Sequence, residues 1–321
     1  MRVMPCSVPG AGHGSQAAKL AAIAPRGIVS LCLGFTMKRQ DLRFFHRLRV
    51  RWAEVDMQKI VFNGHYLMYL DTAMADYWRA LALPYEQAMH ELGGDLYVKK
   101  ASVEYHGSAR YDDVLDVGLK CVRVGNSSIE FLGAIYRGEE LLISGQLIYV
   151  YADPATQTSR PVPQALRDTL LGYEAGEPVV QLRTGPWSQM EDDAMRVRIE
   201  VFVEEQQIPL DMERDPADAA SLHLVAYNRL GQAVATGRLL PAQGGTGRIG
   251  RMAVKRVLRH ASLGSQVLAV LIDSARDRGD RQVLVHAQQT ATEFYSRIGF
   301  KPQGEGFEED GLPHIEMVRA L

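Results

Sequence analysis

The sequence contains few cysteines and no long apolar run. Its three cysteines, Cys6, Cys32 and Cys121, lie far apart and form no Cys-x-x-Cys pair, so neither a disulfide framework nor a zinc site is expected. The most apolar candidate segment, GIVSLCLGF, is much shorter than the roughly 20 apolar residues that cross a bilayer. We therefore expect a cytoplasmic protein with no membrane span and no metal.

The sequence also lacks a charge bias. Its 36 basic residues nearly balance 38 acidic ones, which gives a formal net charge of -2, and nucleic acid is therefore not an expected partner. The chain of 321 residues exceeds the length of roughly 250 residues at which a single core stops growing. Two soluble domains are expected.

Residues 1–36 are rich in small residues and show no sustained periodicity. We predict that they form a disordered extension. They do not resemble a signal peptide, because the alanine cluster precedes the weakly apolar stretch instead of following it. Our interpretation is that Met37 is the true start.

The remaining pattern predicts two unlike α+β domains joined by a linker. Within residues 37–151, one strand, a long amphipathic helix over 64–82 and four further strands follow one another. Residues 152–178 contain several prolines and a short helical pattern and are interpreted as the linker. Over residues 179–321, strands alternate with helices, and this arrangement is typical of a mixed α/β domain.

The segment VRWAEVDMQKIVFNGHYLMYLD resembles the signature of hot-dog acyl-CoA thioesterases of the 4-hydroxybenzoyl-CoA type. This resemblance implies an antiparallel sheet wrapped around the long helix, with Asp56 as general base or nucleophile. It also implies that backbone N–H groups at the start of the helix hold the thioester carbonyl, near Asn63 and Tyr66. Active sites of this family form between subunits, so a dimer or tetramer is expected.

These roles suit thioester hydrolysis, which needs a group that delivers water and a dipole that holds the developing oxyanion. A helix N-terminus supplies the dipole, and Asn63 is expected to cap the helix and contact the substrate. A turn or capping role is the alternative for Asp56, because an isolated aspartate in a polar turn usually has that role. Lys59 departs from the family pattern, in which a glycine often follows the aspartate.

From about residue 180 the chain resembles GNAT N-acetyltransferases, in particular a bacterial group marked by RIEVFVEEQQIP and EEDGLPHIEM. Their CoA motif is Arg/Gln-x-x-Gly-x-Gly/Ala at the start of a helix, and it reads RHASLG here, with Ser262 in place of the first glycine. Free amides and a helix N-terminus bind the CoA pyrophosphate in such a motif, and an arginine adds charge. Serine can still cap the helix and offer a hydroxyl to phosphate. The resemblance assigns CoA binding to Met252, Ala253, Val254, Arg259, His260, Ser262, Leu263, Gly264 and Ser265.

The same resemblance implies that Tyr295, within HAQQTATEFYSRIGF, protonates the departing CoA thiolate. The amine acceptor must also lose a proton. No single base stands out among the five candidates Glu204, Glu205, Asp215, His223 and His314. We favour His314, although a strand histidine satisfied by its neighbours is an equally good interpretation.

The two resemblances together predict a bifunctional enzyme. It would hydrolyse acyl-CoA and transfer an acetyl group from acetyl-CoA to a primary amine, with both CoA esters as substrates and no tightly bound cofactor. An alternative follows from Ser262 and from the lack of a clear base. In that alternative, the thioesterase is active and the GNAT half senses CoA without catalysis.

Overall fold

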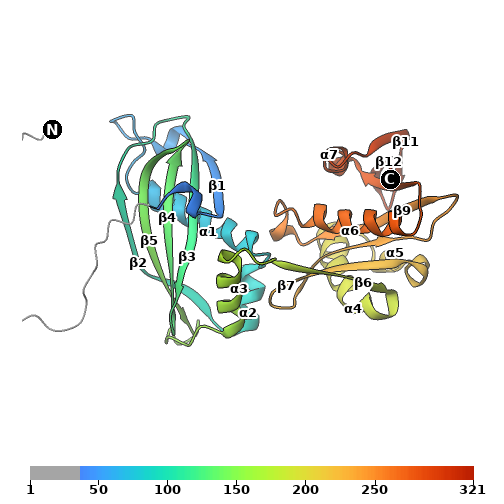
Figure 1. Ribbon diagram of the computed structural model, residues 1–321, viewed down its shortest axis with the longest axis horizontal. Coiled ribbons are helices and arrows are strands. Elements are labelled where there is room, and N and C mark those ends of the chain that lie inside the picture. Colours follow the sequence, from blue (N-terminus) through green and yellow to red (C-terminus); the bar gives the residue numbers. More distant parts are fainter. Residues whose placement is uncertain (1–36) are drawn as a thin grey trace, which may run out of the picture. The chain divides into compact units, whose positions relative to one another are not determined.

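The computed structural model describes residues 37–321 (Figure 1). The predictions made for residues 1–36, and those for Cys6 and Cys32, lie outside the described residues. The described part contains two α+β domains, each with its own sheet. The predicted fold class is therefore confirmed.

The first domain is an antiparallel sheet that curves around helix α1 (His65–Ala80) (Figure 1). Its five strands lie in the order β1-β3-β4-β5-β2. They are β1 (Phe44–Arg49), β2 (Asp95–Tyr105), β3 (Val114–Val124), β4 (Ser128–Arg137) and β5 (Glu140–Ala152). Because β2 pairs only with β5, one edge of the sheet is formed by β2.

One face of α1 forms the centre of the first core. Tyr66, Leu70, Ala73 and Tyr77 recur every three or four residues, and all are buried, as the amphipathic pattern predicts. Gly133 of β4 allows the helix to approach the sheet, since a Cβ atom there would lie only 2.5 Å from Leu70 Cδ2. A side chain at this position would force the Leu70 side chain to move.

Helix α2 (Tyr85–Leu92) was not expected from the sequence. Pro84 was interpreted only as the end of the preceding helix, but it is also the N-cap residue of α2. Proline is tolerated at a helix start, because the N–H that it lacks would have no partner there. A helix of only two turns after a proline carries little periodic signal.

Helix α3 (Gln164–Glu174), predicted as a short linker helix, packs into the first core. Its Leu166, Leu170 and Tyr173 are buried there. Glu174 Oε1 accepts hydrogen bonds from the Tyr77 hydroxyl at 2.6 Å and from the Cys121 backbone N–H at 2.9 Å. The segment that follows β5 is thus held on the first domain by both apolar and polar contacts.

The second domain contains a seven-stranded mixed sheet, in which only β9 and β10 run parallel to each other. Its strand order is β11-β12-β10-β9-β8-β7-β6. The strands are β6 (Val180–Pro186), β7 (Leu222–Asn228), β8 (Ala233–Leu239), β9 (Thr246–Val254), β10 (Gln282–Gln288), β11 (Lys301–Glu309) and β12 (Leu312–Ala320).

Helices cover both faces of this sheet. On β7, Leu224 and Ala226 face α6 (Leu263–Asp277), whereas Val225 and Tyr227 face α4 (Trp187–Arg198), as alternation along a strand requires. Helix α4 continues as a π-helix, Ile199–Glu205. The short helices are α5 (Leu210–Glu213) and α7 (Thr292–Arg297).

The second sheet opens between β9 and β10. Their parallel pairing ends at Ile249 and Val285, although β9 continues to Val254. Just after Ile249, β9 contains a β-bulge, in which two of its residues, Arg251 and Met252, stand opposite one residue of β8. Arg251 has a φ of 50°, and the bulge redirects the β9 backbone at the open edge.

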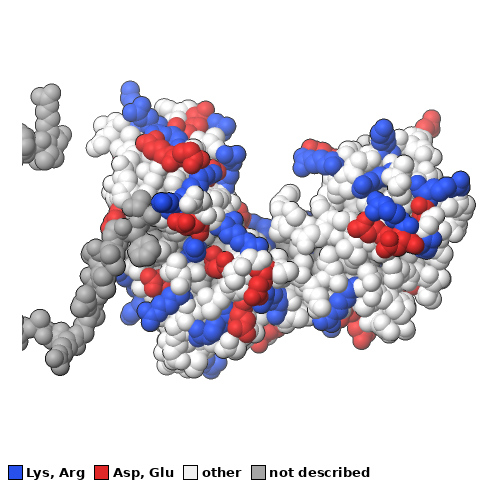
Figure 2. Space-filling model, in the orientation of Figure 1, with Lys and Arg blue, Asp and Glu red and all other residues white. Residues whose placement is uncertain are grey.

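The charged side chains on the face shown in Figure 2 are mixed in sign over both domains. This distribution agrees with the small net charge of the chain. Within residues 37–321, no helix is both long and apolar enough to cross a membrane.

Candidate active sites

Asp56 lies in a tight turn just before α1. Its backbone N–H donates to Ile60 O at 2.9 Å, and its Oδ1 accepts from Gln58 N–H at 2.7 Å. Lys59, in the same turn, has a φ of 61°, in the left-handed region that glycine enters most freely. Asp56 therefore stabilises the turn, which is the role given above as the alternative to catalysis. Its Oδ2 has no hydrogen-bond partner within residues 37–321.

The start of α1 is not capped by Asn63. The N-cap residue is Gly64, and no side chain caps the helix; the prediction of an Asn63 cap was wrong. Gly64 already has right-handed helical angles, and His65 N–H bonds to Phe62 O at 2.9 Å, so the chain turns before Asn63 can reach the helix. No side chain therefore caps the N–H groups of the first turn, and such groups can stabilise a developing negative charge.

Tyr66 is part of the core. It is 2 % exposed, and its hydroxyl accepts a hydrogen bond from Ala109 N–H at 2.9 Å. Burial raises the pKa of this hydroxyl above its ordinary value. The structure therefore places Tyr66 where it anchors the loop after β2, and we do not assign it a chemical step.

The sequence reasoning overlooked Glu54, a buried carboxylate two residues before Asp56. It accepts from the Tyr69 hydroxyl at 2.8 Å and from Arg51 N–H at 2.7 Å. Burial raises the pKa of Glu54, but the hydrogen bonds from Arg51 and Tyr69 outweigh that effect and hold the pKa below its usual range. Because Glu54 O also accepts from Phe62 N–H at 2.9 Å, this residue fixes both sides of the Asp56 loop.

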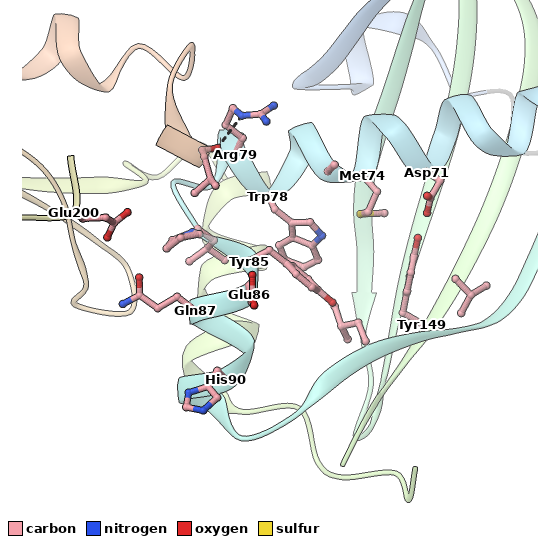
Figure 3. Close-up of a pocket in the computed structure, with 16 residues that line it drawn as sticks. Asp71, Met74, Trp78, Arg79, Tyr85, Glu86, Gln87, His90, Tyr149 and Glu200 are labelled. Carbon is pink, nitrogen blue, oxygen red and sulfur yellow. Dashed lines mark hydrogen bonds between the residues drawn. The ribbon is translucent and has the colours of Figure 1, made fainter. Parts of the chain in front are cut away.

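A cavity of about 830 Å³ lies at the other end of α1 (Figure 3). Its walls include Met74 and Trp78 of α1, Tyr85 of α2 and Tyr149 of β5. The wall also contains polar and charged side chains, namely Asp71, Arg79, Glu86, Gln87, His90 and Glu200. The apolar and aromatic part of the wall suits an acyl or aroyl group. With 1.5 Å per helical residue, Trp78 lies roughly 20 Å along the helix from its start near Asp56, so one chain does not bring Asp56 to this cavity.

In the second domain, two residues of the loop before α6 have left-handed backbone angles. His260 and Ser262 have φ values of 70° and 61°, in the left-handed region that glycine enters freely. Ser262 is the N-cap residue of α6 but makes no side-chain cap bond, so its expected capping role was wrong. The first-turn amides of α6 are therefore not blocked by the serine hydroxyl.

Arg259 makes a bidentate ion pair with Glu205, with both N···O distances 2.7 Å. Its Nε donates to Val254 O at 3.3 Å, which links the loop to the end of β9. The guanidinium remains 37 % exposed. Arg259 thus lies at the loop as predicted, but a carboxylate holds it in this structure.

A smaller cavity of about 220 Å³ lies at the open edge between β9 and β10. Met252 of β9 and Gln288 of β10 line it, and Tyr295 of α7 contributes to the same wall. Burial raises the pKa of Tyr295 to about 12, so the hydroxyl keeps its proton at neutral pH. Tyr295, the predicted acid, and the bulged strand β9 therefore line the same cavity.

The chain matches two known families in separate regions. Residues 58–144 match the thioesterase superfamily, and residues 189–321 match the acetyltransferase (GNAT) domain. The chain is 34% identical over 128 residues to the uncharacterized N-acetyltransferase YjcF of Bacillus subtilis, a match that covers 40% of this chain and 90% of that protein. The chain joins a thioesterase-superfamily domain to a GNAT domain.

Two further proteins are similar to parts of the chain. Protein ElaA of Escherichia coli is 32% identical over 131 residues, which cover 40% of this chain and 85% of ElaA. The crystal structure of Slr0204, a 1,4-dihydroxy-2-naphthoyl-CoA thioesterase from Synechocystis, aligns with a TM-score of 0.37 at 20% identity, over 40% of this chain and 95% of that one.

The GNAT domain places only two of the five candidate bases at the small cavity, Asp215 and His314. Glu204 is exposed and lies outside the cavity wall, and Glu205 is paired with Arg259. His223 is 1 % exposed and packs against Trp187, and burial lowers the pKa of its imidazole. His223 is therefore held neutral within the core.

Asp215 belongs to a buried ion-pair network that supports the cavity wall. Asp218 accepts from both Arg198 at 3.0 Å and Arg238 at 2.5 Å, and Arg238 also pairs with Asp215. Burial raises the pKa of each aspartate, but the hydrogen bonds and charges of the arginines outweigh it and lower both values. Because the arginines keep these carboxylates charged, Asp215 is a weak base.

Proposed function

We propose that the protein is a bifunctional enzyme that hydrolyses acyl-CoA in its first domain and transfers acetyl from acetyl-CoA to a primary amine in its GNAT domain. The acetyl transfer is supported chiefly by one observation. The neutral Tyr295 hydroxyl, the bulged β9 strand and the open sheet edge share one cavity. A buried hydroxyl in that position can donate its proton to a leaving thiolate.

The hydrolysis rests on Asp56 and the start of α1. An aspartate with a free Oδ2 can deliver a water molecule or attack the thioester carbonyl itself. The uncapped N–H groups of the first turn of α1 can stabilise the oxyanion. The apolar cavity beside Trp78 and Tyr85 then suits the acyl group of the substrate.

We further propose that the thioesterase site is completed by a second copy of the chain. One chain separates Asp56 from the cavity by roughly the length of α1. If two α1 helices pack antiparallel, each Asp56 lies beside the partner's cavity. The free edge of β2 favours this association, since its Val98 is 57% exposed and its outer edge can pair with another strand.

A second function has two observations in its favour. The Glu205 carboxylate occupies Arg259, the arginine expected to face CoA phosphate, and the loop carries left-handed residues without glycine. Weak CoA binding without transfer would make the GNAT domain a sensor that regulates the thioesterase. An exposed ion pair is worth little, however, so CoA phosphate can displace Glu205.

Activity assays on the purified full-length protein distinguish these functions. We expect CoA release from acyl-CoAs of graded length and from an aroyl-CoA without amine, and amine-dependent CoA release from acetyl-CoA. Mass spectrometry should detect the acetylated amine. Hydrolysis without any acetylated amine, together with acetyl-CoA binding in calorimetry, would instead favour the sensor.

A further inference from the structure

A histidine outside the original set of candidate bases stands at the opening of the GNAT sheet. His286 directly follows Val285, the last β10 residue that pairs with β9. Its Nδ1 lies 2.7 Å from Oε2 of Glu309 in β11. Both side chains line the same cavity of about 220 Å³ as Tyr295. The imidazole therefore faces the place where the two strands separate.

Three charged groups surround this imidazole. Besides Glu309, Arg248 of β9 lies 2.9 Å from Nδ1, and Glu316 of β12 lies 3.9 Å from Nε2. Arg248 also donates to Glu309 Oε1 at 3.0 Å. We assign the Nδ1 proton to the bond with Glu309, because Arg248 already has a carboxylate oxygen as its acceptor. Nε2 then carries the free lone pair.

The groups around Glu309 favour its ionised form. The hydrogen bond from His286 is the main reason that the pKa of Glu309 is lowered to about 2. Glu309 is therefore ionised throughout the physiological range. A carboxylate on Nδ1 orients the imidazole and stabilises its protonated form, as a base that must accept a proton requires.

We propose that His286 is the general base of acetyl transfer and that Glu309 is the positioning residue that orients it. This inference rests on the proposed acetyl transfer. His314, the base favoured from the sequence, has its Nδ1 2.8 Å from Leu312 O and stacks on Phe307. Phe307 also contacts His286 edge to face, with ring centroids 4.8 Å apart. His314 thus helps to fix the wall beside the base.

Nε2 of His286 takes one proton from the acceptor ammonium, and the free amine forms a C–N bond to the thioester carbonyl carbon. The carbonyl electron pair moves to oxygen and returns as the C–S bond breaks. The thiolate takes the proton of the Tyr295 hydroxyl, the surplus nitrogen proton restores that hydroxyl through water, and the imidazolium releases its proton to solvent.

Charges of both signs line the cavity. The carboxylates are Asp215, Glu309 and Asp310, and the guanidinium groups are those of Arg238, Arg248 and Arg251. Asp310 lies 3.6 Å from Arg251, and Asp215 pairs with Arg238. An aliphatic primary amine arrives as an ammonium ion at neutral pH and therefore needs a base before it can attack.

Kinetics of full-length variants test the base. With spermidine, L-lysine and tyramine as probe amines, we expect His286→Gln to lower kcat for acetyl transfer by about 10² to 10⁴ at pH 7. The loss should shrink as pH rises and free amine accumulates. Glu309→Gln should keep a hydrogen-bond acceptor yet move the acid limb of the pH profile to lower pH, because the imidazolium loses its counter-charge. His106→Gln, in the first domain, is the matched control.

A second measurement does not depend on the acceptor. The ring nitrogen chemical shifts of His286, measured by NMR in the full-length protein, should show the proton on Nδ1 in the unmodified chain, and this tautomer preference should be lost in Glu309→Gln. An unchanged tautomer overturns the Glu309 role, and an active protein with an unchanged pH profile in His286→Gln overturns the base. If NMR shows this tautomer change but the unmodified protein acetylates none of the three probe amines, the proposed acetyl transfer is what fails.

Discussion

The two candidate sites differ in how much of each is supplied by one chain. At the GNAT site, α7, β10 and β11 bring Tyr295, His286 and Glu309 to one cavity. At the thioesterase site, Asp56 lies on a surface turn, and the apolar cavity lies at the far end of α1. If the proposed functions hold, a single chain can complete the acetyl-transfer site, whereas the proposed hydrolysis needs a second copy of the chain.

The largest expected effect separates the two activities. Asp56→Asn should reduce thioester hydrolysis by about 10² to 10⁴, because an amide can keep the turn bond to Gln58 N–H but cannot act as a base or nucleophile. Acetyl transfer and oligomeric state should not change, since the second site shares no partner with Asp56. Both activities are measured on one preparation. Retained hydrolysis would leave Asp56 with its turn role alone.

A charge on the β2 edge tests the need for a second copy. Val98→Lys should convert the proposed dimer to a monomer in size-exclusion chromatography and lower hydrolysis at least tenfold, because edge lysines oppose strand pairing. Acetyl transfer should persist. Val122→Lys is the matched control, because Val122 is 40% exposed on β3, inside the same sheet. Full hydrolysis by a monomer would contradict the shared site.

The CoA loop gives a smaller effect. Arg259→Ala should weaken acetyl-CoA binding roughly 10-fold to 100-fold, since a hydrogen bond to a charged group is worth about 1.5–3 kcal/mol. Glu205→Gln should strengthen binding, because it removes the carboxylate that competes with phosphate for the guanidinium. Calorimetry on each variant measures both changes. Equal acetyl-CoA affinities in the unmodified protein and in both variants would show that Arg259 does not bind the CoA phosphate.

The smallest effect concerns backbone strain in the same loop. Ser262→Gly should raise the free energy of unfolding by up to about 1 kcal/mol, because relief of the left-handed strain exceeds the added flexibility of the unfolded chain. Ser265→Gly, within the first turn of α6, should lower it by about 0.5–1 kcal/mol. Denaturant titrations compare the two. A loss of stability in Ser262→Gly would show that the serine side chain makes a stabilising contact.

Repeating patterns in the sequence determined the elements and their order. The stripe from Tyr66 to Tyr77 predicted α1, and the alternating runs predicted the strands of both sheets, because burial on one face imposes a regular spacing. Motif spacing placed Asp56 before α1 and Ser262 at the start of α6. The roles of these residues stay predictions. Helix α2 was not predicted, because a helix of two turns is too short to show such a pattern.

Contacts between distant residues were decided only by the tertiary structure. Arg259 meets Glu205 across 54 positions, and His286 meets Glu309 across 23; spacing along one element cannot reveal such pairs. Backbone angles were equally hidden, since Lys59 and Ser262 adopt left-handed φ values that their side chains do not favour. The sequence alone thus determined which faces are buried, and the packing of those faces decided which charged groups meet.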